Sequence, residues 1–222
     1  VRVYENVYGA WTQLGNDIDG EAEYDNSGYS VSLSSDGHTV AIGAKKNDGV
    51  NGSSSGHVRV HKFENGDWTQ IGQDIDGEAY LDYSGHSVSL SADGTIVAIG
   101  APYNDAGVTY SDRGHVRIYQ RDINAAIGWE QLGGDINGEA DDDESGLSVS
   151  ISADGTIVAI GADDNDVNGN RSGHVRIYQR DINAAIGWVQ LGTDIDGEAA
   201  NDWSGRSISL SSDGMIVAIG AK

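Results

Sequence analysis

The sequence GHVRIYQRDINAAIGW stands at residues 114–129 and occurs again, unchanged, at residues 173–188. Other short motifs recur around it with a period of about 58 residues. The motif W-x-Q-[LI]-G begins at Trp11, Trp68, Trp129 and Trp188, and S-G-x-S begins at Ser27, Ser84, Ser145 and Ser204. The chain therefore consists of four tandem copies of one unit, which we place at residues 1–57, 58–115, 116–174 and 175–222.

Each unit is predicted to form four short β-strands. The first two, such as residues 30–34 and 39–43, alternate apolar and polar side chains and are joined by a Ser-x-Asp-Gly turn, a strong hairpin signal. The third strand follows a Gly-His pair, and the fourth contains the repeated tryptophan, which we expect to pack between sheets. One such sheet cannot bury both faces, whereas radially packed sheets can. We predict an all-β fold of tandem four-stranded antiparallel blades, a β-propeller that stands alone or forms part of a larger ring or assembly.

The two ends of the chain leave the size of the ring open. The sequence begins within a third strand and finishes with a second strand, so pairing of the two ends would complete a fourth blade and remove two open edges. The chain could instead be part of a larger propeller, or two chains could close one ring together. The first residue is not Met and the last lies within a repeat, which suggests a processed product or a portion of a longer protein.

Composition narrows the classes of partner. The formal charge of −22 disfavours nucleic acid and anionic membranes and favours cations, Ca²⁺ above all. The absence of cysteine excludes disulfides, thiolate metal sites and cysteine catalysis. No apolar run approaches the length of a membrane-spanning helix, and no signal peptide is visible.

The order of motifs resembles the FG-GAP repeat family, which forms the blades of integrin α-subunit propellers. The resemblance rests on the succession Ser-Gly, SVSLS, turn, VAIGA, Asn-Asp, Gly-His and VRVY, and on one Gly-Ala-Pro signature at residues 100–102. It implies a propeller, an extracellular or cell-surface location, an adhesion-like function and frequent calcium binding. The loop that holds calcium in the family is only a short turn here. We therefore expect Asp36, Asp93, Asp154 and Asp213 to be turn residues rather than ligands.

A different carboxylate series, D-x-[DN]-G-E-x-x-x-D, precedes the first strand of every unit. Oxygen ligands at alternate positions around a glycine turn can wrap a hard cation, so we predict that these residues bind Ca²⁺. The alternative is a polar turn whose side chains bond nearby backbone amides. The candidate ligands are Asp17, Asp19, Glu21, Asp25, Asp74, Asp76, Glu78, Asp82, Asp135, Asn137, Glu139, Asp143, Asp194, Asp196, Glu198 and Asp202.

The loops after A-I-G-A carry a second group of candidates. Asn-Asp pairs open these loops, where binding residues usually lie on a rigid scaffold, although they also suit simple Asx turns. The candidate binding residues are Asn47, Asp48, Asn104, Asp105, Asn165 and Asp166, with Trp203 as an exposed aromatic near a turn. N-glycosylation sequons fall at Asn51 and Asn170. The histidines that start the third strands, His57, His115 and His174, are expected to hold loops by hydrogen bonds, with metal binding on the ring axis as the alternative.

These features together favour a non-enzymatic extracellular structural or adhesion module that acts through its loops, as a single module or as a subunit of an assembly or filament. The alternative is a lectin-like glycan-binding propeller. We expect partners to be a protein or glycan at the cell surface, or further copies of the chain, without nucleic acid binding or membrane insertion. An enzyme is disfavoured because catalysis needs an asymmetric pocket and the copies look too alike. The sequence also contains no G-x-S-x-G, P-loop or H-E-x-x-H motif.

Overall fold

The computed structural model describes residues 1–105, 107 and 111–222, and the described residues form β-strands without helices. The first complete sheet contains β3 (Ser27–Leu33), β4 (Thr39–Ala44), β5 (His57–Glu64), β6 (Asp67–Gln70) and β7 (Ile75–Asp76). The second contains β8 (Ser87–Leu90), β9 (Ile96–Ala101), β10 (His115–Arg121), β11 (Trp129–Gln131) and β12 (Ile136–Asn137). The third contains β13 (Ser148–Ile151), β14 (Ile157–Ala162), β15 (His174–Arg180), β16 (Trp188–Gln190) and β17 (Ile195–Asp196). The predicted all-β class and antiparallel four-stranded path are confirmed.

The sheets differ from the prediction in two details. A fifth strand of two residues (β7, β12 or β17) pairs with the start of the third strand of each sheet, beside its histidine. The boundaries placed at residues 57, 115 and 174 fall at the first residue of β5, β10 and β15, so each sheet joins parts of two predicted units. The short fifth strand carries the acidic series, which places carboxylates next to the histidine that begins the third strand.

The first strands of successive blades lie against one another. Strand β8 contacts both β3 and β13, and β13 contacts β18, while the third and fourth strands lie farther from this line of contacts. Serines on the first strands bond across the gap: the amide of Leu90 donates to Ser32 Oγ at 3.0 Å, and that of Ile151 donates to Ser89 Oγ at 3.1 Å. Residues at the same repeat position in or next to the first strands therefore lie close together in the folded chain.

Apolar side chains fill the space between neighbouring sheets. One cluster joins β9 and β10 to β14, with Ile118 and Val158 fully buried. The repeated tryptophans lie in the same interfaces: the indole of Trp129 donates to the Ile71 carbonyl at 3.0 Å, and that of Trp188 to the Leu132 carbonyl at 2.7 Å. Their predicted packing between sheets is confirmed, although the equivalent Trp11 remains 70% exposed.

The Ser-x-Asp-Gly turns have the predicted structural role. In the turn between β8 and β9, one oxygen of Asp93 accepts hydrogen bonds from the Ser91 hydroxyl at 2.7 Å and the Thr95 amide at 2.9 Å. The other three turns repeat this arrangement around Asp36, Asp154 and Asp213. These carboxylates are committed to their own turns, as expected.

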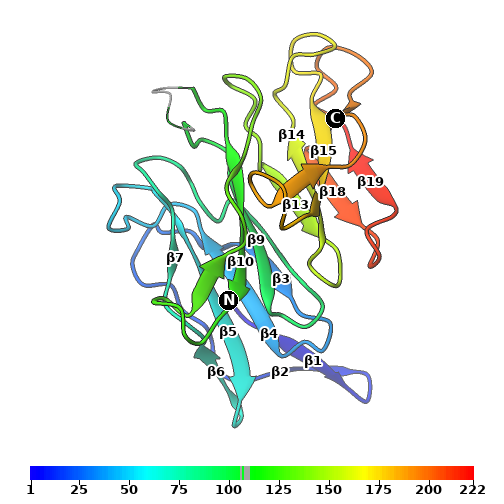
Figure 1. Cartoon of the computed structure of the whole chain (residues 1–222). Helices are drawn as coiled ribbons and strands as arrows, with labels where there is room; N and C mark the ends of the chain where they lie inside the picture. Colours follow the sequence, from blue (N-terminus) through cyan, green and yellow to red (C-terminus); the bar gives the residue numbers. More distant parts are fainter. Residues whose placement is uncertain (106, 108–110) are drawn as a thin grey trace.

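The two ends of the chain form separate two-stranded sheets. Strand β1 (Tyr4–Val7) pairs with β2 (Ala10–Gln13), and β18 (Ser207–Leu210) pairs with β19 (Val217–Gly220). Within the described residues no pairing joins them, and Figure 1 places the two sheets at different ends of the molecule. Of the alternatives that the sequence left open, pairing of the two ends into a fourth blade is not seen among the described residues. The described part of the chain also contains no helix that could span a lipid bilayer.

One core position differs between the sheets and gives a pH prediction. His61 is 8% exposed, its Nδ1 has no hydrogen-bond partner within the described part of the chain, and burial lowers its pKa to about 4. Tyr119 and Tyr178 occupy the equivalent position in the other sheets. Below the ordinary histidine pKa, His61 is protonated in the unfolded chain but stays neutral in the folded protein. The free energy of unfolding therefore decreases as the pH falls from about 6.5 to about 4. We expect His61→Tyr to reduce this loss by about 1 to 3 kcal/mol.

Urea unfolding of both proteins at pH 7 and pH 5 measures this difference. The comparison between the two proteins cancels the titration of groups that the substitution leaves unchanged. Parallel losses of stability in the two proteins would show that His61 takes up a proton without cost in the folded state.

Candidate functional site

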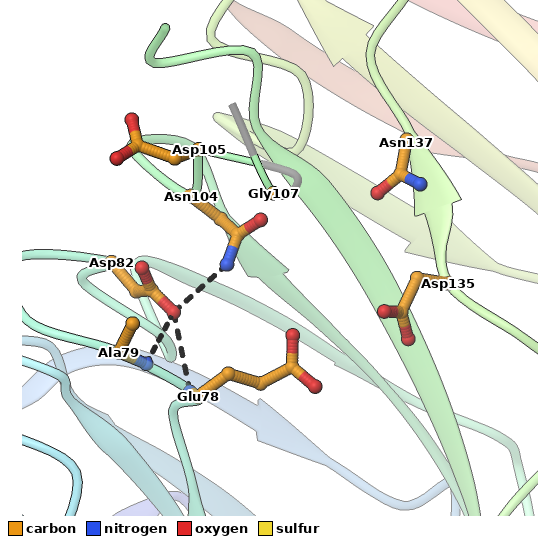
Figure 2. Close-up of a pocket in the computed structure, with 8 residues that line it drawn as sticks. All are labelled: Glu78, Ala79, Asp82, Asn104, Asp105, Gly107, Asp135 and Asn137. Carbon is orange, nitrogen blue, oxygen red and sulfur yellow. Dashed lines mark hydrogen bonds between the residues drawn. The ribbon is translucent and has the colours of Figure 1, made fainter. Parts of the chain in front are cut away.

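The members of each acidic series are separated in the structure instead of surrounding one ion. The last member supports its own loop: Asp82 accepts hydrogen bonds from the backbone amides of Glu78 and Ala79 and from the side chain of Asn104 (Figure 2). The same bond from asparagine reaches Asp25 from Asn47 and Asp143 from Asn165. Among the described residues, no group of metal-ligand atoms is built from one series alone, and metal binding by the candidate ligands stays a prediction.

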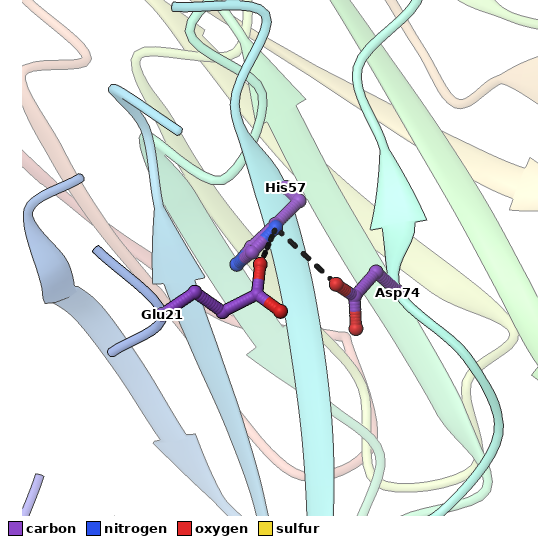
Figure 3. A group of neighbouring side chains, drawn as sticks. All are labelled: Glu21, His57 and Asp74. Carbon is purple, nitrogen blue, oxygen red and sulfur yellow. Dashed lines mark ion pairs between the residues drawn. The ribbon is translucent and has the colours of Figure 1, made fainter. Parts of the chain in front are cut away.

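The glutamate of one series instead meets the first aspartate of the next series, with a third-strand histidine between them. Figure 3 shows Glu21 and Asp74 on either side of His57, which begins β5. The His57 Nδ1 atom lies 4.0 Å from Glu21 and 3.6 Å from Asp74. The same group of residue types recurs twice, as Glu78, His115 and Asp135 and as Glu139, His174 and Asp194. In each group the ligand atoms lie within 4.8 Å of one another.

An arginine on the third strand pairs with the glutamate of each cluster, and in the first cluster it also pairs with the aspartate. Arg59 pairs with Glu21 and donates from Nε to Asp74 Oδ1 at 3.0 Å. The second oxygens of both carboxylates face His57. Arg117 and Arg176 pair with Glu78 and Glu139 in the other clusters at 3.3 and 3.4 Å. Sequence reasoning missed these arginines, although their identical place after Gly-His-Val was a readable signal.

The histidines of the clusters are buried and neutral. Burial lowers the pKa of His57 and His174, and it lowers that of His115 to about 4, although nearby carboxylates oppose the shift. The Nδ1 atoms of His57 and His174 have no hydrogen-bond partner among the described atoms. The prediction that these histidines hold loops by hydrogen bonds is therefore wrong for those atoms. A buried, neutral and unpartnered imidazole nitrogen is in the protonation state that binds a metal ion.

The middle cluster opens onto a cavity of about 410 Å³. Glu78 and Asp135 project into it from opposite walls, and Asp82, Asn104, Asp105 and Asn137 complete much of its polar lining (Figure 2). Burial raises the pKa of Glu78 and Asp82. No lysine or arginine is among the described residues that line the cavity. The cavity can therefore accept a cation or a neutral polar molecule more readily than an anion.

The remaining predicted sites are the Asn-Asp pairs, Trp203 and the two glycosylation sequons. Asn47, Asn104 and Asn165 are buried, and Asp48 and Asp166 accept bonds from backbone amides of their own loops. The Asn-Asp pairs therefore take part in turns, which was the alternative interpretation. Asn104 and Asp105 also line the cavity beside the middle cluster, and a binding role for the pairs stays a prediction. Trp203 is half-buried rather than exposed. Asn51 donates to the Gly77 carbonyl at 2.7 Å, and glycosylation at Asn51 and Asn170 stays a prediction.

Comparison with known families and structures identifies the repeat. A family model described as the FG-GAP repeat matches residues 18–60. Residues 18–60 are an FG-GAP repeat. This match confirms the resemblance, and the later units carry the same order of motifs as the matched FG-GAP unit. A comparison with curated proteins finds no match.

Two solved structures share the fold at low sequence identity. A putative 6-phosphogluconolactonase from Bacteroides uniformis is 15% identical with a TM-score of 0.56, over 98% of this chain and 50% of its own. Hydrazine synthase from Kuenenia stuttgartiensis is 15% identical with a TM-score of 0.52, over 86% of this chain and 57% of its own. The chain thus spans about half the length of these proteins.

These similarities correct the functional prediction. The prediction of a non-enzymatic adhesion or structural module, with a lectin as its alternative, relied on the fold and on the likeness of the copies. The same fold occurs in proteins whose names denote enzymes, including the putative lactonase. The propeller therefore gives no ground for excluding catalysis, and function has to be argued from the sites.

Proposed function

We propose that this chain is a metal-binding hydrolytic propeller whose middle cluster, Glu78, His115 and Asp135, holds a divalent ion beside the adjoining cavity. The observation that carries the proposal is the repeated meeting of two carboxylates with a buried histidine nitrogen, which lacks a partner in His57 and His174. Three protein ligands with one open side are typical of catalytic metal sites, whereas structural sites are usually closed by four. An extracellular location, supported by the FG-GAP match, belongs to the same proposal.

The donor atoms favour a transition metal over the calcium that the FG-GAP resemblance implies. Ca²⁺ takes about six to eight oxygen ligands and rarely binds an imidazole nitrogen. Each cluster offers one imidazole and two carboxylates, which suit Zn²⁺ or Mn²⁺. Donor atoms around tetrahedral zinc lie about 3.3 Å apart. The two separations at His57, 3.6 and 4.0 Å, are slightly longer than this, and rotation of the half-exposed Glu21 can bring its carboxylate closer to the histidine.

The residues around the middle cluster would prepare it for hydrolysis. A bound Zn²⁺ supplies a coordinated water with a pKa of about 7, and it polarises a carbonyl oxygen. Arg117 holds one oxygen of Glu78, and Gln131 donates to Asp135 at 2.7 Å, so both carboxylates keep their orientation. The name of the Bacteroides protein, a putative 6-phosphogluconolactonase, suggests a sugar lactone as substrate class. The acidic cavity favours an uncharged lactone over a phosphorylated one.

Metal stoichiometry tests the binding sites. We expect apoprotein titrated with Zn²⁺ in a calorimeter to bind three ions, one for each cluster. Glu78→Gln should weaken one of the three sites by about 10- to 100-fold, because it removes a charged ligand and keeps its shape. Glu198→Gln is the matched control, since Glu198 occupies the same repeat position and joins no such cluster among the described residues. Equal losses in both variants, or no zinc binding at all, would overturn the metal sites.

Lactone hydrolysis tests the activity separately. We expect the zinc-loaded protein to accelerate hydrolysis of D-glucono-1,5-lactone in a pH-stat, and we expect EDTA or Glu78→Gln to remove most of that acceleration while Glu198→Gln retains it. A protein that binds three zinc ions but leaves the spontaneous rate unchanged would retain the metal sites and refute the hydrolytic function.

A further inference from the structure

A second cavity lies where equivalent positions of all four units converge. It measures about 510 Å³, within the range of about 300 to 1,000 Å³ typical of small-molecule sites. The residue that follows Ser-Gly lines it in every unit, as Tyr29, His86, Leu147 and Arg206. Because the first strands of the blades lie against one another, the starts of those strands surround one shared space. This cavity is separate from the one beside the middle cluster, with which it shares no lining residue.

The residues on either side of the Ser-Gly pair differ between the four units, although the sequence immediately around them is the same. Each unit reads Asp-x-Ser-Gly-x-Ser, with the same four fixed residues in every copy. The first variable position, before Ser-Gly, holds Asn26, Tyr83, Glu144 or Trp203. The second, after Ser-Gly, holds Tyr29, His86, Leu147 or Arg206. A position with the same packing role in every blade would accept the same residue four times. Six of these eight variable residues line the cavity, the exceptions being Asn26 and Tyr83, and their differences produce the asymmetric surface that a specific ligand needs.

The backbone supports a role beyond packing. The first variable position has a left-handed conformation in every unit, with φ of 57° at Asn26, 52° at Tyr83, 53° at Glu144 and 49° at Trp203. Asparagine and glycine tolerate this region, whereas a bulky residue there costs about 1 kcal/mol or more. Tyrosine, glutamate and tryptophan are therefore retained at positions where their backbones are strained. Glu144 and Trp203 line the cavity.

Polar groups in the cavity remain available to a ligand. The Trp203 indole nitrogen is buried and has no hydrogen-bond partner among the residues that the structure describes. Arg206 pairs with Asp163 at 3.0 Å and Arg171 with Asp164 at 3.4 Å. Lys45 has no carboxylate partner among the described residues and lies 3.5 Å from the centre of the Tyr29 ring.

Two further groups change the electrostatics of the cavity. Burial and neighbouring carboxylates raise the pKa of Glu144 to about 7, and burial lowers that of His86 to about 4. Near neutral pH the histidine is therefore uncharged and the glutamate is partly protonated, which leaves Lys45 as the cation without a paired charge.

We infer that this cavity binds a small hydroxylated monocarboxylate of the size of a sugar acid. Lys45 meets the single carboxylate, while Asp163 and Asp164 disfavour a second negative charge. The Tyr29 and Trp203 side chains supply apolar surface in the lining beside the carbon skeleton, and the indole nitrogen and the Glu144 carboxyl bond its hydroxyl groups. This site does not depend on the proposed metal clusters.

Calorimetry on metal-free protein in EDTA tests this inference. We expect sodium D-gluconate to bind at one site per chain, and we expect D-glucose, which lacks the carboxylate, to bind at least about 10-fold more weakly. Lys45→Met should weaken gluconate binding by about 10-fold or more, because it removes the charge and retains the length of the side chain. Lys46→Met is the matched control, since Lys46 is exposed and does not line the cavity.

Thermal unfolding of each variant confirms that it is folded before its binding is measured. No binding of gluconate up to about 10 mM would overturn the site. Equal weakening by the two lysine variants would show general attraction by basic residues, and equal binding of glucose and gluconate would remove the role of Lys45. Because zinc is absent throughout, failure here leaves the proposed hydrolytic function untouched.

Discussion

We expect Gly100→Ala to destabilise the protein by more than about 3 kcal/mol, because the added methyl group has no room between two blades. Gly100 lies in β9, and a Cβ built on it would fall 2.0 Å from the carbonyl oxygen of Gly146 in the next unit. The same approach recurs between Gly43 and Gly85 and between Gly161 and Gly205. A carbonyl oxygen of the backbone cannot rotate away as a side chain can. The blades would therefore have to separate, and urea unfolding measures the loss of stability.

Gly220→Ala provides the control for this substitution. Gly220 is the equivalent residue in β19, where a Cβ would meet only Ser207, mainly its hydroxyl, which can turn aside. We expect a loss of less than about 1 kcal/mol there. If Gly100→Ala fails to fold, soluble yield of the two variants at reduced temperature gives the same ranking. Similar stabilities of the two variants would mean that the blades do not approach as closely as the strand positions indicate.

These glycines explain why much of the fold could be predicted from sequence. Their repetition at a fixed place in A-I-G-A, together with alternating strands and Asp-Gly turns, specifies sheets that must pack tightly on copies of themselves. The antiparallel order of four strands follows from the same pattern. The short strands β7, β12 and β17 could not be predicted, because two residues carry no periodic signal and the pairing depends on the neighbouring strand.

The candidate sites were harder to predict because their parts come from different units. The acidic series suggested ligands that are close in sequence, but Glu21 and Asp74 meet only after two units pack around His57. The variable residues beside Ser-Gly were visible in the sequence, and Tyr83 occupies the position of Trp203. Their convergence depends on the contacts between first strands. The likeness of the copies therefore drew attention away from a cavity lined by residues that differ between them, so this likeness is no argument against an asymmetric pocket.

We expect Trp188→Ala to cost about 3 to 5 kcal/mol, the range of large-to-small substitutions of buried aromatic residues. Trp188 is 3% exposed and packs in the cluster that joins the second and third sheets. Its indole also donates to the Leu132 carbonyl at 2.7 Å, so the substitution creates a cavity and leaves a backbone oxygen of the preceding unit without that bond. Denaturant unfolding followed by far-ultraviolet circular dichroism measures this loss without relying on tryptophan fluorescence.

The repeat supplies a control for Trp188 with the same side chain and the same motif. Trp11 begins the first W-x-Q-[LI]-G segment on β2 and is 70% exposed, so Trp11→Ala should change stability by less than about 1 kcal/mol. The contrast isolates burial between blades from any intrinsic role of tryptophan in the strand. Comparable losses at Trp11 and Trp188 would indicate that β2 is covered in solution, and a small loss at Trp188 would contradict the packing between the second and third sheets.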